Sequence, residues 1–360
     1  MINFAMHCHL LLPDLFWPDA NVPDVYRGLE LPALQRLLAK GRQEAGERRA
    51  AALGEDVTAS AEDWLCRRFG LEREAGWPIA PCSLLADGGE PGAHYWLRAD
   101  PVHLRLEGGH LMLADSGAFA LSQQEAERIA DSLNAHFAGD GLAFLALRPQ
   151  RWYLGMQQAP ALQTTPLAQA AGRSIEALLP RGADAALWHA RLNEIQMLLH
   201  GHAVNEQREA AGAPVINSLW LWGGGSLPTG LPAACNAVWS RDPFAAGLAQ
   251  AARVASRALP EDATELLRAG AGSGVHAILL DQLRAAARYG DAHGWRESLL
   301  QLERDWFAPL LDALRQERVG MLSLHGFGPA GRLSSEVTHG DLRRFWRRVR
   351  PLAHYVGGIV

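Results

Sequence analysis

Apolar and polar residues follow two alternating patterns along this chain. Short apolar runs at 2–12, 275–280 and 319–324 are typical of buried strands. Longer segments at 31–49 and 295–317 carry apolar residues three and four apart, which predicts amphipathic helices. The alternation of the two patterns predicts an α/β fold with a doubly wound, mostly parallel sheet.

The stretch 214–228 reads Pro-Val-Ile-Asn-Ser-Leu-Trp-Leu-Trp-Gly-Gly-Gly-Ser-Leu-Pro. Its apolar run predicts a strand buried on both faces of the parallel sheet. The glycines from Gly223 to Gly225 then indicate a backbone feature that favours glycine, either positive φ or close approach of a ligand or a second chain. The alternative is a flexible turn flanked by packing tryptophans.

Residues 91–175 have a different pattern of apolar and polar positions. Strands at 95–106 and 110–115 flank Gly108-Gly109, which is a hairpin signal. Ser122 and Glu125 form a capping box for a helix that reaches residue 137, and strands at 143–148 and 152–156 follow. The proline- and glycine-rich segment 76–92 predicts a linker or domain boundary. We therefore expect a small α+β domain at 91–175, inserted into a core formed by 1–90 and 176–360.

Two further segments carry polar stripes. The predicted helix 184–202 places His189, Asn193, Gln196 and His200 beside its apolar face. Such a stripe either lines a cleft or is a solvated flank, and the flank is commoner. The segment 341–351 contains five arginines around two aromatic residues. As an amphipathic helix it would meet an anion or an acidic partner, or it would be a solvated terminal helix.

Composition narrows the classes of function. The chain has 360 residues, 48% of them hydrophobic and 20% charged, as in an ordinary globular protein with a sizeable core. A net charge of −5 argues against binding to nucleic acid or an anionic membrane, and no apolar run is long enough to span a bilayer. The four scattered cysteines are typical of reduced thiols. We expect a cytoplasmic protein.

Candidate chemistry is concentrated at the ends of predicted strands. Neither a nucleotide P-loop nor a G-x-S-x-G nucleophile motif occurs. Asp14, His325 and His339 follow or end predicted strands, so we expect them to share one site. His7 and His9 would lie on one strand face, where two imidazoles are too few for a closed metal site and semi-buried polar residues are the favoured interpretation.

The order of segments resembles a known family over most of the chain. The strings Leu-Pro-Ala-Leu-Gln-Arg-Leu at 31–37, Leu-Leu-Pro-Arg-Gly at 178–182 and His-Ala-Val-Asn-Glu-Gln-Arg at 202–208 resemble the archaeal-type cofactor-independent phosphoglycerate mutases of the alkaline phosphatase superfamily. The amino-acid sequence at 96–104, 193–200 and 217–223 resembles that of the RpfE-type regulatory proteins of proteobacteria. The resemblance implies an alkaline-phosphatase-like core.

The metal ligands that this resemblance implies are only partly present. Asp14 matches the first metal aspartate, and His339 matches a later metal histidine. His325 matches the histidine of an Asp-His pair whose aspartate falls at Leu324. A second pair, Asp-x-x-x-His, falls near Arg284 and Arg288, which are cations where a metal needs anionic or neutral ligands.

The implied substrate residues are also altered. Trp222 stands where the mutases have a substrate arginine, while Arg98 is retained and Arg151 is shifted from another. The catalytic serine has no convincing counterpart, because Ser60 and Ser83 lack its glycine-rich context.

These observations predict a degenerate mutase that binds rather than catalyses and needs no cofactor. Its ligand would be a small phosphorylated or other anion, or a protein partner. The residues expected to hold an anion are Arg98, Arg151, Trp222, Gly223, Gly224, Arg284 and Arg288. The alternative is a phosphoglycerate mutase or phosphatase with a rearranged site that uses manganese or zinc.

Overall fold

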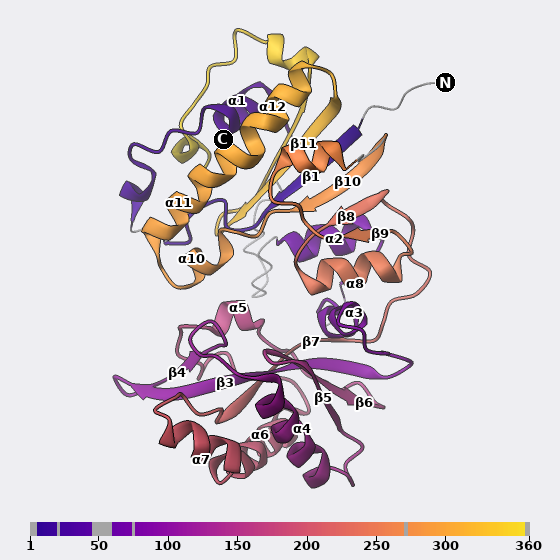
Figure 1. Cartoon of the computed structure of the whole chain (residues 1–360), viewed down its shortest axis with the longest axis vertical. Coiled ribbons are helices and arrows are strands. Elements are labelled where there is room, and N and C mark those ends of the chain that lie inside the picture. Colours follow the sequence, from indigo (N-terminus) through magenta and orange to yellow (C-terminus); the bar gives the residue numbers. More distant parts are fainter. Residues whose placement is uncertain (1–5, 20–21, 45–59, 74–75, 270–272, 357–360) are drawn as a thin grey trace. The chain divides into compact units, whose positions relative to one another are not determined.

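The chain folds into two compact units, formed by residues 1–71 with 231–360 and by residues 72–230 (Figure 1). The structure, a computed structural model, describes residues 6–19, 22–44, 60–73, 76–269 and 273–356. We call the two units the core unit and the second unit. None of the helices in these ranges is long and apolar enough to cross a membrane.

The core unit is built on a seven-stranded sheet in the order β2-β12-β11-β1-β10-β8-β9. Five neighbouring strands run parallel, namely β11 (Val319–Gly328), β1 (Met6–Leu12), β10 (Gly274–Leu279), β8 (Ala237–Trp239) and β9 (Ala255–Arg257). Antiparallel β12 (Gly331–Thr338) and β2 (Arg42–Glu44) complete one edge. The predicted α/β class with a mostly parallel sheet is confirmed.

Helices connect and cover these strands. They are α1 (Pro32–Lys40), α2 (Ala61–Arg68), α8 (Pro243–Ala251), α9 (Ala263–Arg268), α10 (Arg284–Arg288), α11 (Ala292–Leu302) and α12 (Ala308–Arg315), with short 3-10 turns η1 (Pro23–Tyr26), η3 (Gly340–Arg343) and η4 (Leu352–Tyr355). A π-helical turn, η2 (Glu303–Phe307), joins α11 to α12. Pro309 has no N–H to donate to the carbonyl four residues earlier, which accounts for the irregularity predicted within 295–317.

The second unit is an antiparallel sheet in the order β4-β3-β6-β5, with β7 also paired to β3. Its strands are β3 (Tyr95–Glu107), β4 (His110–Ala114), β5 (Ala143–Arg148), β6 (Arg151–Met156) and β7 (Ser218–Gly225). Its helices are α3 (Ile79–Ala86), α4 (Gln123–His136), α5 (Leu167–Ala170), α6 (Ala185–His200) and α7 (Ala203–Ala210). The hairpin at Gly108-Gly109 and the Ser122–Glu125 capping box are both confirmed.

The stretch 214–228 does not lie where we predicted. Its strand, β7, pairs antiparallel with β3 and belongs to the second unit, not to the parallel sheet. Helices α3 and α6 both pack on it. Apolar residues at every position report burial but not the direction or identity of the neighbouring strand, which explains the error.

Several predicted boundaries also differ. The segment 76–92, expected to be a linker or domain boundary, contains α3, and the compact units divide at residues 72 and 231 instead of 91 and 176. The helix expected at 31–49 ends at Lys40, where Gly41 leads into β2, and 45–49 lie outside the described residues. The segment 341–351 is not an amphipathic helix, because only the single 3-10 turn η3 extends into it.

Candidate functional site

Acidic side chains gather at the carboxyl ends of three parallel strands in the core unit. Asp14 follows β1, Asp281 follows β10, and Asp242 follows β8 and caps the amino end of α8. A fourth carboxylate, Glu62, comes from the first turn of α2. Sequence reasoning identified only Asp14, although Asp242 and Asp281 carried the same signal, an acid within three residues of the end of an apolar strand.

The cation among these acids is Arg284, on α10. Its guanidinium lies 2.5 Å from a carboxylate oxygen of Glu62 and 3.7 Å from one of Asp242. The side chains of all three are only 20–25% exposed. We call Asp14, Glu62, Asp242, Asp281 and Arg284 the acid cluster.

Proton affinities in the acid cluster reflect this arrangement. Burial raises the pKa of Asp14 and that of Asp242, with the neighbouring charge of Glu62 adding to both and Arg284 opposing it. For Glu62, burial alone would raise the pKa, but the Arg284 cation and hydrogen bonds lower it overall. Arg284 therefore neutralises Glu62 most directly. In turn, the charges of Glu62 and Asp242 raise the pKa of Arg284, although burial opposes that rise.

Asp14 is held in an unusual backbone conformation. Its φ of 56° lies in the left-handed region, and its carbonyl accepts a hydrogen bond of 2.8 Å from the indole of Trp295. Aspartate visits this region more readily than most residues because its short side chain bonds locally. The tight turn after β1 directs the chain away from the sheet at the acid cluster.

His325 belongs to a different group of side chains. Its ring nitrogens lie 3.0 Å from His9 Nδ1 and 3.0 Å from Ser334 Oγ. Trp64 of α2 packs on both imidazoles, with centroid distances of 5.1 Å to His9 and 4.8 Å to His325. Burial lowers the pKa of His9 to about 2 and that of His325 to about 3, so this pair is neutral.

The predicted face of β1 is confirmed, because the rings of His7 and His9 lie together with centroids 4.2 Å apart. They are packed and hydrogen-bonded residues, since His7 Nε2 lies 2.9 Å from Ser323 Oγ. Burial lowers the pKa of His7 as well. These contacts support the interpretation of semi-buried polar residues.

His339 lies at the other edge of the sheet. Thr338 pairs with Met321 near the amino end of β11, whereas Leu12 pairs with Gly326 near its carboxyl end. These two registers are about 17 Å apart along the strand. His339 therefore lies apart from Asp14 and His325, which are at the carboxyl end of β1 and β11, and the prediction that all three share one site is wrong. The last strand, β12, runs antiparallel and returns the chain to the opposite edge.

Carboxylates and imidazoles are the side chains that a two-metal centre would need. In the part of the chain that the structure describes, no three or more His, Cys, Asp or Glu side chains are placed to hold a metal ion. The acid cluster contains carboxylates, but a guanidinium already lies against two of them. Arg288, at the end of α10, adds a second positive charge that acts on Asp14.

Ser60 and Ser83 occupy structural positions. Ser60 caps the amino end of α2, where its hydroxyl accepts a hydrogen bond of 3.1 Å from the Asp63 backbone N–H. Ser83 is fully buried within α3 of the second unit. Only Ser60 lies in the element that supplies Glu62 to the acid cluster.

In the second unit, Arg98 forms a buried ion pair with Asp100, and Trp222 is hydrogen-bonded to the same carboxylate. Arg98 lies 2.6 Å from Asp100, and both side chains are at most 7% exposed. The indole of Trp222 donates a hydrogen bond of 2.7 Å to the other Asp100 oxygen. The Arg98 guanidinium also lies between two aromatic rings, 5.2 Å from Trp222 and 5.5 Å from Tyr153.

Arg151 is likewise held by a carboxylate. It donates two hydrogen bonds to Asp87, of 2.9 Å and 2.6 Å, and Tyr153 donates a third of 2.6 Å. Burial would raise the pKa of Asp87, but the bonds from Arg151 and Tyr153 lower it overall. Arg98 and Arg151, two of the four arginines expected to bind an anion, are thus already neutralised within the unit.

The glycines have a packing role. Gly223 has φ +64°, and a Cβ there would lie 2.8 Å from Ile79 Cβ on α3. A Cβ on Gly224 would lie 2.8 Å from Leu97, and one on Gly225 2.7 Å from Pro78. The expected close approach is therefore made by α3 and β3 of the same unit.

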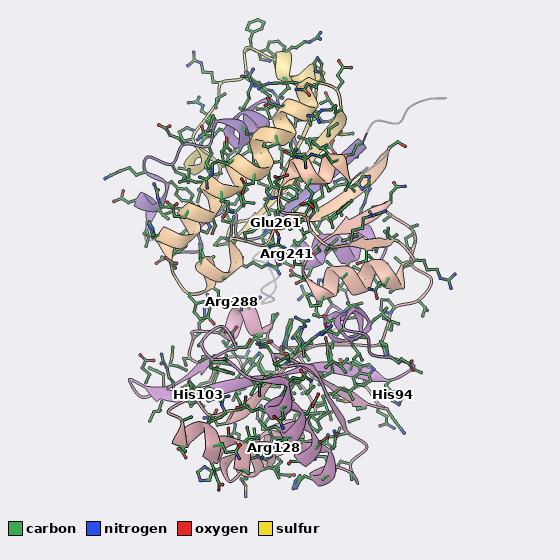
Figure 2. All side chains as sticks on the ribbon, in the orientation of Figure 1. His94, His103, Arg128, Arg241, Glu261 and Arg288 are labelled. Carbon is green, nitrogen blue, oxygen red and sulfur yellow. The ribbon has the colours of Figure 1, made fainter. Side chains whose placement is uncertain are left out.

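Two hollows lie within single units. In the core unit, a cavity of about 200 Å³ is bordered by Arg241, Gln282 and the ion-paired Glu261; Figure 2 labels Arg241 and Glu261. In the second unit, a cleft of about 760 Å³ is lined by Asn193, Gln196 and His200. The polar stripe of α6 does line a cleft, although His189 instead bonds the Pro180 carbonyl.

Comparison with known proteins finds similarity over part of the sequence and over most of the fold. No family model matches the chain. The 2,3-bisphosphoglycerate-independent phosphoglycerate mutase of Methanosarcina mazei is 29% identical over 137 residues, which are 37% of this chain and 34% of that protein. The probable enzyme of the same name from Geobacter sulfurreducens is 26% identical over 132 residues, 36% and 33% of the two chains. The chain matches about a third of the length of these curated relatives.

Solved structures match over far more of the chain. A cofactor-independent phosphoglycerate mutase from Thermoplasma acidophilum aligns with a TM-score of 0.50 at 15% identity, over 99% of this chain and 95% of that one. A protein from Pyrococcus horikoshii aligns with a TM-score of 0.58 at 13% identity, over 94% and 88%. The fold is that of cofactor-independent phosphoglycerate mutase. Within this mutase fold, the acid cluster stands at the carboxyl ends of the parallel strands and Arg284 stands among its carboxylates.

Proposed function

We propose that this chain is a phosphoglycerate-mutase-like protein without a working two-metal centre, and that it acts by binding a protein partner in a regulatory role. The observation that carries the proposal is the position of Arg284. Its guanidinium lies against Glu62 and Asp242, where a divalent cation would need the same carboxylates. Catalysis of phosphoryl transfer depends mainly on charges that stabilise the transition state, so the loss of the metals removes most of it.

The state of Arg98 and Arg151 favours a protein over a small anion as the ligand. Arg98 is neutralised by Asp100, and Arg151 by Asp87. A phosphate would have to displace a carboxylate from either one. The RpfE-type resemblance, which is regulatory by name, agrees with a binding role.

A second candidate is a mutase or phosphatase with a rearranged site that uses manganese or zinc. It is favoured by Ser60, whose hydroxyl lies at the amino end of α2, two residues before Glu62. In this alternative, Ser60 would serve as the nucleophile and the acid cluster would exchange Arg284 for metal. Phosphoglycerate would then be the substrate.

The experiment that separates the two is metal binding followed by assay. The purified chain is equilibrated with manganese or zinc and its bound metal is measured, together with interconversion of 2- and 3-phosphoglycerate. We expect substoichiometric metal and no activity above a metal-free blank. Near-stoichiometric metal, or turnover that Ser60→Ala abolishes, would overturn the proposal.

An Arg284→Met variant supplies the matched control. If Arg284 takes the place of a cation, its removal leaves carboxylates that manganese can stabilise. Manganese should therefore raise the unfolding midpoint of the variant but not that of the unmodified chain. Equal shifts in both proteins would count against the role given to Arg284.

A further inference from the structure

The segment 343–350 presents an exposed aromatic and basic surface. Phe345 is 87% exposed, Trp346 66% and Val349 47%, and these three are among only eight large exposed hydrophobic residues in the described part of the chain. The two aromatic rings meet edge to face with centroids 5.2 Å apart. We call residues 343–350 the arginine–aromatic loop, drawn within the yellow part of Figure 1.

The loop is fixed to the core unit at both ends. Leu342 before it packs partly buried against the main hydrophobic cluster, and Leu352 and Tyr355 after it are buried members of that cluster. Such anchoring argues against a freely moving tail.

The middle of the loop is held by the only lysine of the chain. Lys40, itself buried, donates hydrogen bonds of 2.7 Å to the Arg344 carbonyl and 2.5 Å to the Arg347 carbonyl. In return, the Arg347 guanidinium donates to the carbonyls of Lys40 and Gly41. The aromatic side chains are thus presented from a backbone that is already ordered.

Charge on the loop is strongly positive. Arg344 is paired with Asp341 at 2.6 Å, and Arg347 is used in the anchor. Arg343, Arg348 and Arg350 remain exposed. Within the described residues, no carboxylate forms an ion pair with these three, whereas the whole chain has a net charge of −5. The loop is a local reversal of the overall charge.

We propose that the arginine–aromatic loop is the docking surface for a partner protein, and that this partner offers an acidic segment with large apolar side chains. Tryptophan and arginine are the residues that most often dominate binding energy at interfaces. An ordered backbone lowers the entropy lost on binding. The inference rests on the proposed function, since it names the surface by which a non-catalytic mutase-like protein would act.

The alternatives are extended polyanions or a second copy of this chain. The overall negative charge of the chain opposes an anionic membrane or nucleic acid, whose charge extends well beyond a single loop. A compact acidic and apolar segment matches the loop in size as well as in charge. These other occupants are outcomes of the test below.

The test uses the full chain and random dodecapeptides displayed on phage, because the natural partner is unidentified. We expect selected peptides to be enriched in Asp and Glu and to carry a large apolar residue. Their affinity, measured by fluorescence anisotropy of synthetic copies, should fall at least about tenfold in Phe345→Ser/Trp346→Ser and in Arg348→Glu/Arg350→Glu. Met197→Ser, which removes an equally exposed apolar side chain from the second unit, should leave it unchanged.

Lys40→Met tests the anchor separately, because it leaves every exposed side chain of the loop in place. We expect weaker peptide binding in this variant at an unchanged fold, as shown by circular dichroism. Selection of peptides without acidic enrichment, equal binding by the loop variants, or no selected peptide would each overturn the proposal. So would loop-dependent binding only to phosphatidylglycerol vesicles, only to single-stranded DNA, or only to another copy in sedimentation. Metal content and mutase assay are read independently, so failure of the proposed function is distinguishable from failure of the loop.

Discussion

Replacing Arg284 by methionine is the sharpest perturbation of the acid cluster. The substitution keeps a long side chain but leaves Glu62 and Asp242 without the cation that now lies 2.5 Å and 3.7 Å from them. Two unit charges about 4 Å apart in a medium of effective dielectric about 20 interact by about 4 kcal/mol. Removing one partner of a buried pair typically costs about 3–5 kcal/mol. Because these groups are 20–25% exposed, solvent screening should reduce the loss below that range, to about 2–3 kcal/mol.

The assay is urea unfolding at neutral pH, with Arg241→Met as the matched control. Arg241 lies 3.0 Å from Glu261, but these side chains are 50% and 87% exposed, so this variant should lose at most about 1 kcal/mol. Both arginines are in the core unit, and they differ mainly in burial. A double variant, Arg284→Met with Glu62→Gln, should recover part of the loss because it removes an uncompensated charge.

The contribution of Arg284 to stability should depend on pH. The folded state lowers the pKa of Glu62 from 4.5, so this group contributes stability above that pH that is lost as the pH falls further. The difference between the unmodified chain and Arg284→Met should therefore shrink below about pH 4.5. A loss no larger than that of Arg241→Met, or one independent of pH, would refute the central role of Arg284.

Three further predictions concern buried groups. Burial lowers the pKa values of His9 and His325 well below the 6.5 of an unfolded histidine, so their full contribution to stability should be present above pH 6.5. The free energy of unfolding should fall by about 2 kcal/mol per histidine at about pH 5. Urea unfolding across pH measures this loss, and a flat profile would contradict it. Gly223→Ala should reduce stability in thermal unfolding by about 1–3 kcal/mol more than Gly108→Ala does. Both glycines have positive φ, but of the two only Gly223 would place a Cβ within 4 Å of a neighbour. Equal losses of stability would show that packing is not the cause. Asp100→Asn should destabilise the second unit by about 3–5 kcal/mol in a urea titration, because it leaves the buried Arg98 unpaired, and a loss below about 1 kcal/mol would contradict that account.

The local pattern of the sequence determined most elements of this fold. The capping box at Ser122, the hairpin at Gly108-Gly109 and the alternation of strands and helices in the core unit were all predictable. Each depends on interactions between residues close in sequence, where spacing and side-chain chemistry specify the outcome. Asp14 was identified for the same reason, as an acid directly after a buried strand.

Only the tertiary structure decided which neighbours these elements meet. An apolar strand such as β7 is buried equally well in a parallel or an antiparallel sheet, and its glycines were explained only when α3 was seen to pack on them. His339 was separated from Asp14 because β12 returns antiparallel, which its own residues do not specify. The sequence alone shows that Arg98 and Arg284 carry a positive charge. Whether such a charge is available to a ligand depends on carboxylates brought to it by distant segments, as Glu62 is brought to Arg284 across 222 residues.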